Sequence, residues 1–321
     1  MEELITISIA LCTCNGERFI AEQLASLTKQ TLSPIELVVC DDASDDGTWP
    51  LLQQFQHSAP FPVRLYRNVS RLGIGQNFQQ AIQLCNGDAI ALCDQDDVWL
   101  PEKLRLYAKY FENGADAVCC DAQITNANLT PLGYTLWERV TFSALERKIA
   151  CDGRMLEVVL KHFVIAGATL AFRTELRDRV LPIPSNWLYD AWIVVALASG
   201  ARLCLVNQCL QLYRQHENNA IGGQQRPIIS KVRNALITSR GEYLNLEIYR
   251  WELYRERFVA NEASPSPLKQ VDEKLGHLRR RVAFPSCRLW RIPYVISEVF
   301  RRGYLRYSRN WGSAALDLFI R

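Results

Sequence analysis

Short apolar runs alternate with amphipathic stretches over the first 112 residues. Runs of strand length, rich in apolar or β-branched residues, lie at Thr6–Cys12, Ile35–Cys40, Val63–Tyr66 and Ala89–Cys93. Between them, apolar residues recur three or four apart, as in helices that pack on a sheet, in Glu17–Lys29, Thr48–Gln56 and Gly75–Cys85. This order predicts an α/β fold with a doubly wound, mainly parallel sheet.

The pattern becomes weaker beyond residue 112. Pro101 stands where it can open a helix that runs to about Glu112, and residues 126–150 are ambiguous. The remaining expected elements are a strand at Ala117–Ile124, a helix at Met155–His162, a buried strand at Phe163–Phe172, a buried helix at Asp190–Ser199, a strand at Arg202–Tyr213, helical sequence over Ile228–Arg257, and a linker or turn at Ser264–Pro267. We therefore expect an α/β domain over residues 1–223 and a helical extension over residues 224–321.

Composition and cysteine placement suit a globular protein of a reducing compartment. The 321 residues are 49% hydrophobic, enough for a large core, and several of the 11 cysteines lie inside apolar runs, where a thiol behaves as a small buried hydrophobe. The N-terminus lacks a basic region followed by a long apolar core, and the longest uncharged apolar stretch, Ala191–Ala201, is shorter than the roughly 20 residues of a membrane-spanning helix. These features predict a cytoplasmic protein.

Polar clusters follow three of the predicted strands. They are Thr13-Cys14-Asn15-Gly16-Glu17, Asp41-Asp42-Ala43-Ser44-Asp45-Asp46-Gly47 and Asp94-Gln95-Asp96-Asp97. Ligands of doubly wound sheets bind outside the carboxyl ends of the strands, so these clusters should meet at one rim.

Two acidic pairs on this rim each allow two interpretations. Asp94 and Asp96 could present oxygen ligands to Mg²⁺ or Mn²⁺, and so bind a diphosphate, or could belong to a solvated acidic turn. Asp41-Asp42 could accept a hydrogen bond from a base N–H, or acids of this segment could cap the helix near Thr48, a role that suits Asp45 and Asp46.

Motifs are spread along roughly residues 4–223. They are Leu11–Glu17, Asp41–Ser44, Asn68–Asn77 with Gly73, Leu92–Trp99 followed by Pro101 and Lys103-Leu104, Gly167-Ala168-Thr169, Tyr189–Trp192 and Leu212–Asn219. Their order and spacing resemble the family 2 glycosyltransferases of GT-A fold, especially their bacterial rhamnosyltransferase-like branch. Two positions depart from the family pattern: Cys14 replaces an aromatic residue, and Tyr189 replaces a histidine or glutamate before the catalytic aspartate.

The resemblance assigns roles to particular residues. The residues that it places in the nucleotide pocket are Thr13, Asn15, Glu17 and Asp42, with Asp42 facing the base. Asp94 would lie by the ribose and diphosphate, and Asp96 would ligate the divalent cation. Asp190 matches the carboxylate that deprotonates the acceptor hydroxyl, so that a single displacement inverts the anomeric carbon.

Three further assignments rest partly on the residues themselves. Asp190 is the only acid between Asp178 and Glu217 and begins an apolar helix, so it could be a general base, an N-cap, or both. His216 could ligate the metal or contact phosphate, or be a structural histidine. Arg71 could approach the diphosphate or simply be solvated.

The C-terminal segment is basic and rich in aromatic residues. The whole chain carries 37 basic and 34 acidic residues, for a net charge of +3, but from Leu275 onward the only acids are Glu298 and Asp317. Such a segment can lie on an anionic membrane, or can form a helical subdomain whose aromatic residues pack on the catalytic domain. Nucleic-acid binding is disfavoured, since no recognised motif accompanies the charge.

The expected reaction is transfer of a sugar, with L-rhamnose from dTDP-L-rhamnose as the favoured donor, to a hydroxyl of a growing cell-surface polysaccharide or lipopolysaccharide. A UDP-hexose donor and a catalytically inactive protein that binds sugar nucleotides or glycans are the alternatives. Nucleotidyl transfer is disfavoured because it requires a glycine-rich basic loop after the first strand, and Thr13–Glu17 contains a single glycine.

Overall fold

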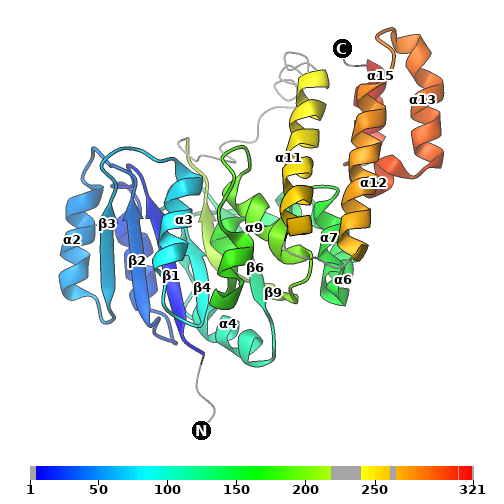
Figure 1. Cartoon of the computed structure of the whole chain (residues 1–321). Coiled ribbons are helices and arrows are strands. Elements are labelled where there is room, and N and C mark those ends of the chain that lie inside the picture. Colours follow the sequence, from blue (N-terminus) through cyan, green and yellow to red (C-terminus); the bar gives the residue numbers. More distant parts are fainter. Residues whose placement is uncertain (1–4, 218–239, 261–264, 310, 320–321) are drawn as a thin grey trace. The chain divides into compact units, whose positions relative to one another are not determined.

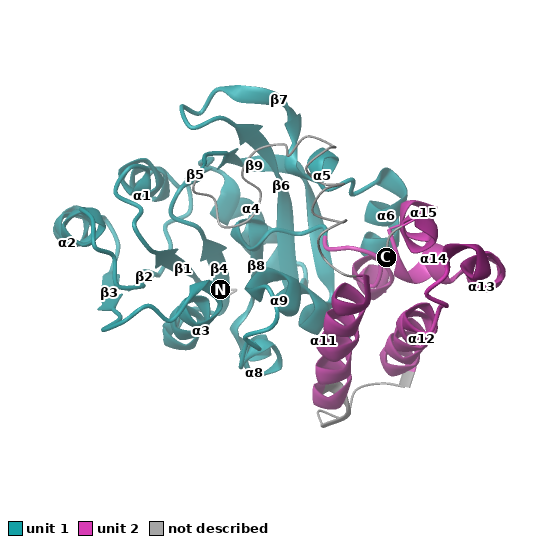
Figure 2. Cartoon of the chain, turned by 90° about the horizontal axis from the view of Figure 1, so that it is seen from above, with its two compact units in different colours: residues 1–153, 164–223 teal, residues 154–163, 224–321 magenta. Residues whose placement is uncertain are grey.

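The structure is a computed structural model that describes residues 5–217, 240–260, 265–309 and 311–319. The chain divides into two compact units, shown in Figure 2. Unit 1 comprises residues 1–153 and 164–223, and unit 2 comprises residues 154–163 and 224–321. Residues 154–163 thus belong with the C-terminal residues, although they lie inside the predicted α/β domain.

Unit 1 is built on one sheet, which has nine strands within the described residues. The strands are β1 (Ile7–Thr13), β2 (Glu36–Asp41), β3 (Val63–Arg67), β4 (Ala89–Cys93), β5 (Val98–Trp99), β6 (Ala117–Thr125), β7 (Pro131–Thr135), β8 (Leu170–Arg173) and β9 (Leu203–Arg214). Their order is β3-β2-β1-β4-β8-β6-β9-β5, with β7 paired to β6. The first four strands pair in parallel, β8 runs antiparallel to both of its neighbours, and β6 and β9 are parallel.

Helices cover both faces of this sheet. They are α1 (Ile20–Thr28), α2 (Thr48–Ser58), α3 (Ile74–Leu84), α4 (Lys103–Glu112), α5 (Leu136–Arg139), α6 (Ala144–Ile149), α8 (Arg177–Val180) and α9 (Tyr189–Ala198). Figure 2 shows α1, α2 and α4 on one side and α3 and α9 on the other. The core strands are buried on both faces, since the neighbouring residues Ile9 and Ala10 of β1 point to opposite faces and neither has exposed surface. The predicted doubly wound α/β sheet is confirmed.

Two predictions in unit 1 were wrong. Only Leu170–Arg173 of the strand expected at Phe163–Phe172 is extended, because a 3₁₀ turn occupies Gly167–Thr169. A Cβ atom on Gly167 would lie 2.3 Å from the Tyr189 hydroxyl oxygen, so this turn packs directly against α9. The helix expected from Pro101 begins instead at Lys103, after a turn closed by the Lys103 amide on Leu100 O.

Unit 2 is helical. Its helices are α7 (Met155–Val159), α11 (Arg240–Ala260), α12 (Pro265–Val282), α13 (Arg288–Phe300), α14 (Gly303–Tyr307) and α15 (Trp311–Phe319). Prolines 265 and 267 lie in the first turn of α12, where amide groups have no intrahelical partner, so the turn predicted for Ser264–Pro267 is wrong over 265–267. Ser264 and the predicted helical residues 228–239 lie outside the described residues. Within the described part of the chain, no helix combines the length and hydropathy that crossing a bilayer requires.

A buried ionic network joins the helices of unit 2. The Glu298 carboxylate is 2% exposed, accepts a hydrogen bond from Arg280 and lies 2.6 Å from His277 Nδ1, while Ser308 Oγ lies 3.0 Å from the other ring nitrogen. Burial opposes ionisation of Glu298, but the contacts with His277 and Arg280 outweigh it and lower its pKa to about 2. The ionised carboxylate therefore stabilises the fold of unit 2.

Glu298→Gln should destabilise the full chain by about 1.5–3 kcal/mol at pH 7, the value of hydrogen bonds to a charged group. Since folding lowers the pKa from about 4.3, this stability is present above pH 4.3 and is lost as the pH falls toward 2. Urea denaturation across this pH range checks both statements. Glu252→Gln is the control, because it removes a half-exposed partner of Arg279; an equal loss in both variants would contradict the prediction.

Candidate active site

The predicted site residues lie at the carboxyl edge of the parallel strands. Thr13 and Asp41 end β1 and β2, Asp94 follows β4, and His216 follows β9 two residues after its end. Since β8 runs in the opposite direction, its beginning lies at this same edge, next to the 3₁₀ turn that packs on α9. Segments far apart in sequence therefore converge on one rim, as the sequence predicts.

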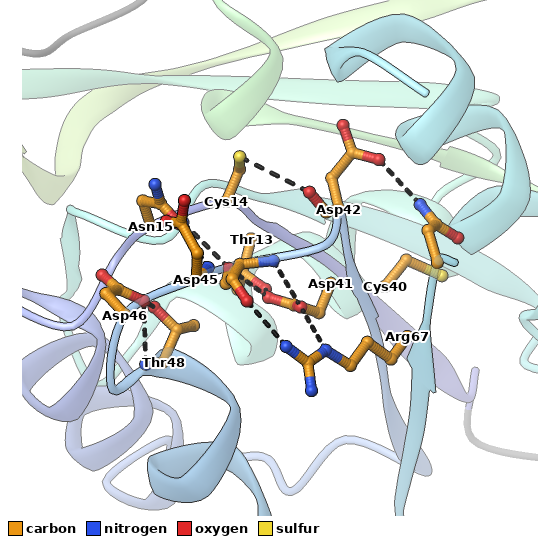
Figure 3. A network of polar contacts seen from close by, with 12 residues as sticks. Thr13, Cys14, Asn15, Cys40, Asp41, Asp42, Asp45, Asp46, Thr48 and Arg67 are labelled. Carbon is orange, nitrogen blue, oxygen red and sulfur yellow. Dashed lines mark hydrogen bonds and ion pairs between the residues drawn. The ribbon is translucent and has the colours of Figure 1, made fainter. Parts of the chain in front are cut away.

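A network of polar contacts joins the loops after β1 and β2 (Figure 3). The buried Asp41 carboxylate accepts hydrogen bonds from Thr13 Oγ1 (2.8 Å) and from the Ser44 amide (3.0 Å), and Arg67 Nε lies 3.6 Å from it. Thr13 is 2% exposed. Its hydroxyl thus holds the Asp41 side chain, which in turn binds the Ser44 amide of the next loop.

Asn15 and Glu17 fix the loop between β2 and α2. The Asn15 amide donates to Ser44 Oγ (2.9 Å), and its Oδ1 accepts from the Asp45 amide (3.0 Å). Glu17 Oε2 accepts from the Gly47 amide (2.9 Å). Asn15 has a φ of 50°, a conformation that asparagine adopts more readily than most residues. Both predicted nucleotide-pocket residues are on the rim and hold a neighbouring loop there.

Asp45 and Asp46 of the β2–α2 loop make different contacts. Asp46 Oδ1 accepts from the Thr48 amide (3.0 Å) at the start of α2, but the N-cap itself is Gly47, so Asp46 bonds the first turn from one residue before the cap position. Asp45 does not cap the helix, since its carboxylate is largely exposed and lies 3.6 Å from Arg71. Arg71, predicted to contact the diphosphate, has a half-exposed side chain on this same rim.

Asp42 organises the loop between β3 and α3. Its carboxylate accepts hydrogen bonds from Asn68 Nδ2 (2.9 Å), the Leu72 amide (2.7 Å) and the Gly73 amide (2.8 Å). Gly73 has a φ of 85°, which glycine adopts without strain, and it precedes the first residue of α3. The side chain expected to face a base therefore also sets the position of α3.

The Asp94–Asp97 segment brings several carboxylates together. Burial, then the charges of Asp96 and Asp190, raise the pKa of Asp94 to about 7. Asp97 is buried and accepts hydrogen bonds from Gln211 Nε2 (2.9 Å) and the Arg214 amide (3.0 Å), which makes it structural. The acidic cluster is thus largely removed from solvent, unlike the exposed acidic turn that was the alternative interpretation.

Gln95 connects this cluster to the first strand. Its Oε1 accepts from the Cys14 amide (2.9 Å), and its Nε2 donates to Cys14 O (3.0 Å). A Cβ atom on Gly16 would lie 2.2 Å from Gln95 Oε1, so a larger residue there would displace the Gln95 side chain. The sequence analysis missed this role of Gln95, because nothing in the sequence pairs two segments 81 residues apart.

Asp96 and His216 form a pair whose chemistry fits a divalent cation. His216 Nε2 lies 2.8 Å from Asp96 Oδ2, and both side chains are mostly buried. Mg²⁺ and Mn²⁺ sites commonly take one or two protein side chains and complete their shell with waters and substrate phosphates. No group of three or more His, Cys, Asp or Glu residues suited to a metal occurs within the described residues, so this pair would need the donor diphosphate to complete the shell.

Arg214 contacts the residues around the Asp96–His216 pair. Its guanidinium donates to Asp96 O (2.7 Å) and Ala127 O (2.6 Å), forms an ion pair with Glu22, and lies over the Phe19 ring. The His216 ring also packs against the Phe19 ring, with centroids 4.6 Å apart. Arg214 therefore positions Asp96 and His216 and is itself occupied by protein contacts.

Asp190 lies in the first turn of α9. The N-cap is Leu188, which lacks a side-chain cap, so the N-cap interpretation of Asp190 is wrong; its Oδ1 accepts from the adjacent Ala191 amide (2.7 Å). Burial raises its pKa above the ordinary value. A carboxylate with a raised pKa, in a segment that reaches the rim, has the properties of a general base.

Tyr189 links the segment of Asp190, the candidate base, to the acidic cluster. Its hydroxyl donates to Asp94 Oδ1 (3.2 Å), and its ring stacks on Phe78 with centroids 4.1 Å apart. Sequence analysis noted Tyr189 only as a departure from a pattern. The tyrosine directly before the candidate base was nevertheless a signal for a site residue, because its hydroxyl can donate a hydrogen bond at the rim.

This fold and rim define a glycosyltransferase of GT-A type, and solved structures share the fold. One is TarS from S. aureus in complex with UDP-GlcNAc, with a TM-score of 0.59, 16% identity, and coverage of 85% of this chain and 72% of that chain. Another is the Pyrobaculum calidifontis mannosyltransferase PcManGT in complex with GDP-Man and Mn²⁺, with a TM-score of 0.57, 18% identity, and coverage of 93% and 76%.

The family model for glycosyl transferase family 2 matches residues 8–179, and the chain belongs to this family. Among curated relatives, the dTDP-rhamnosyl transferase RfbG of Shigella flexneri is 27% identical, over 83% of this chain and 88% of the relative. The Escherichia coli protein WfgD, a UDP-Glc:α-D-GlcNAc-diphosphoundecaprenol β-1,3-glucosyltransferase, is 28% identical, over 52% of this chain and 64% of the relative. The predicted family and enzyme class are confirmed.

Proposed function

We propose that this glycosyltransferase moves L-rhamnose from dTDP-L-rhamnose to a hydroxyl of a growing cell-surface polysaccharide or lipopolysaccharide, with inversion of the anomeric carbon. The acceptor is a glycan or a lipid-linked glycan, and the enzyme works in the cytoplasm at the inner face of the cytoplasmic membrane. The similarity to RfbG along most of both chains supports the donor. The observation that carries the reaction type is the hydrogen bond from Tyr189 to Asp94, which brings the residue next to Asp190 to the acidic cluster.

The proposed reaction is a single displacement. Asp190 accepts the proton of the acceptor hydroxyl as its oxygen attacks the anomeric carbon. A new glycosidic C–O bond forms while the C–O bond to the β-phosphate breaks, and the nucleoside diphosphate leaves with the bonding electron pair. Attack from the face opposite the leaving group inverts the configuration. The raised pKa of Asp190, caused by burial, suits it to hold this proton.

In this proposal Asp96 and His216 hold a divalent cation, Mg²⁺ or Mn²⁺. When bound, the cation offsets negative charge on the departing diphosphate. Thr13, Asn15, Glu17 and Asp42 line the nucleotide side of the rim, with Asp42 toward the base, and Arg71 and Asp94 lie toward the diphosphate and ribose.

A UDP-hexose is the second candidate donor. It is favoured by the similarity to WfgD, whose name specifies UDP-Glc, over about half of this chain. A protein that binds sugar nucleotides without transferring them is the third candidate, and the retained Asp190 and the Asp96–His216 pair argue against it.

Turnover of a donor panel tests the proposal. The purified chain, supplied with Mn²⁺ and an acceptor extract, should release nucleoside diphosphate from dTDP-L-rhamnose in preference to UDP-glucose, UDP-GlcNAc and GDP-mannose. Release from UDP-hexoses without release from dTDP-L-rhamnose would refute the rhamnose assignment and leave the transferase reaction standing. Absence of turnover with every donor, despite donor binding, would favour the inactive protein.

A further inference from the structure

Helix α13 exposes most of its large apolar side chains to solvent and buries two charged side chains, together with Val295, in the interior of unit 2. Leu289, Pro293, Ile296 and Phe300 follow the helical spacing of one face and are all exposed, Leu289 and Phe300 at 77% and 83%. The inward face carries Arg291 and Glu298, both buried. A surface helix of a globular protein has the opposite arrangement, with apolar residues toward the core.

The interior of unit 2 satisfies these inward charges. Arg291 donates to Pro285 O (2.7 Å) and to Asp317 O (3.0 Å), and Glu298 takes part in the network with His277 and Arg280. Hydrogen bonds and ion pairs of the buried Arg291 and Glu298 therefore hold α13 in place. They also fix which of its side chains face solvent.

Helix α15 likewise buries an acidic residue, beside the apolar Ala314, and exposes several large apolar side chains. Its buried residues include Asp317, which accepts hydrogen bonds from Arg281 Nε (2.6 Å) and Tyr304 (2.7 Å). Trp311, Leu316 and Phe319 are exposed. The exposed apolar side chains of α13, of α15 and of Leu305 in α14 are together called the aromatic face of unit 2. Its members are Leu289, Trp290, Ile292, Tyr294, Ile296, Phe300, Leu305, Trp311, Leu316 and Phe319.

Cations accompany the aromatic face, and its acids are hidden. The only acids from residue 283 to the end of the chain are Glu298 and Asp317, which are 2% and 1% exposed. The exposed arginines in this part of the chain are Arg288, Arg301, Arg302, Arg306 and Arg309. Arg301 and Arg306 lie near Glu298 and Glu273, and their side chains remain about 60% exposed. A surface that combines exposed Trp, Tyr, Leu and Phe side chains with exposed arginines has the composition of an interfacial membrane-binding element.

We propose that the aromatic face of unit 2 binds the surface of a membrane that contains anionic lipid. The apolar side chains of α13 and α15 enter the boundary between headgroups and acyl chains, and the arginines contact lipid phosphates. The helices lie on the bilayer, since within the described ranges none has the length and hydropathy to cross it. The inference is independent of the donor assignment, because it rests on unit 2 alone.

Vesicle flotation tests the proposal with the full chain and no sugar nucleotide. The protein should float with phosphatidylcholine vesicles that contain phosphatidylglycerol, and binding should weaken as salt screens the arginines. Trp290→Glu/Phe300→Glu should lower binding by about tenfold or more, because both side chains are exposed and the change places charge at the boundary. Leu132→Glu/Leu145→Glu, at exposed leucines of unit 1, is the matched control and should bind like the parent chain.

A second pair of substitutions separates charge from apolar insertion. Arg288→Gln/Arg302→Gln should lower binding to anionic vesicles by about fivefold per arginine and should leave binding to pure phosphatidylcholine unchanged. Equal flotation of the parent chain and the Trp290→Glu/Phe300→Glu variant would overturn the proposal. So would a parent chain that does not bind vesicles and instead forms a dimer that these substitutions abolish, because the aromatic face would then serve a second copy of the chain.

Discussion

Asp190→Asn should bind the donor like the parent enzyme and transfer sugar about 10²–10⁴-fold more slowly, the usual contribution of a general base. The asparagine side-chain oxygen can still accept the hydrogen bond from the Ala191 amide, so the first turn of α9 should be preserved. The amide cannot take a proton from the acceptor hydroxyl. The loss should therefore be confined to kcat at saturating donor.

Two measurements on the same preparations check this result. Initial rates give the fall in turnover, and calorimetric titration with the nucleoside diphosphate gives donor-site affinity. Glu112→Gln, an exposed acid on α4, is the control for loss of a negative charge and should match the parent chain in both. Transfer by Asp190→Asn at the parent rate would show that another group accepts the proton.

Asp96→Ala should weaken donor binding in the presence of Mn²⁺ by about 10–100-fold, the scale of effects seen when the immediate surroundings of a metal are altered. The substitution leaves His216 as the only protein side chain of the pair, and a cation held through one imidazole would bind the diphosphate poorly. Donor affinity of the variant should also become nearly indifferent to EDTA.

The comparison for Asp96→Ala is titration of each protein with the nucleotide sugar, once with Mn²⁺ and once with EDTA. Glu102→Ala removes an exposed acid six positions along, whose partner is Arg105, and should retain the full metal dependence. Equal donor affinities with and without metal in the parent chain would mean that Asp96 does not act by binding a metal ion.

The sequence predicts the parallel half of the sheet well, because its signals are local. The runs that become β1 to β4 are buried on both faces, and each is followed by a clear helical pattern. The strand expected at Phe163–Phe172 fails for a reason that lies outside the segment. Gly167 begins a 3₁₀ turn that lies against the Tyr189 ring, and nothing within the segment itself indicates this contact.

The candidate site, too, has features that the sequence predicts and features that depend on contacts between distant segments. The meeting of Asp94 and Asp96 with the loops after β1 and β2 follows from strand order, because parallel strands end at the same edge. Asp190 follows no parallel strand, and its segment reaches the rim through the contact of Tyr189 with Asp94. The tasks of Asn15 and Asp42 could not be predicted, since each depends on hydrogen bonds with backbone amides about 30 residues away. In the C-terminal segment, composition indicates a basic aromatic surface, but only packing reveals that Glu298 and Asp317 point inward.

Thermal unfolding with a panel of nucleoside diphosphates and nucleotide sugars, each with Mn²⁺ and with EDTA, tests the central claim that this rim is a metal-dependent donor site. A ligand that binds the native state at 100 times its Kd stabilises it by about 2.7 kcal/mol, which is readily seen as a rise in Tm. We predict that dTDP or UDP compounds raise the Tm with Mn²⁺ and have little effect with EDTA. An unchanged Tm with every nucleotide, with and without Mn²⁺, would contradict the donor-site assignment.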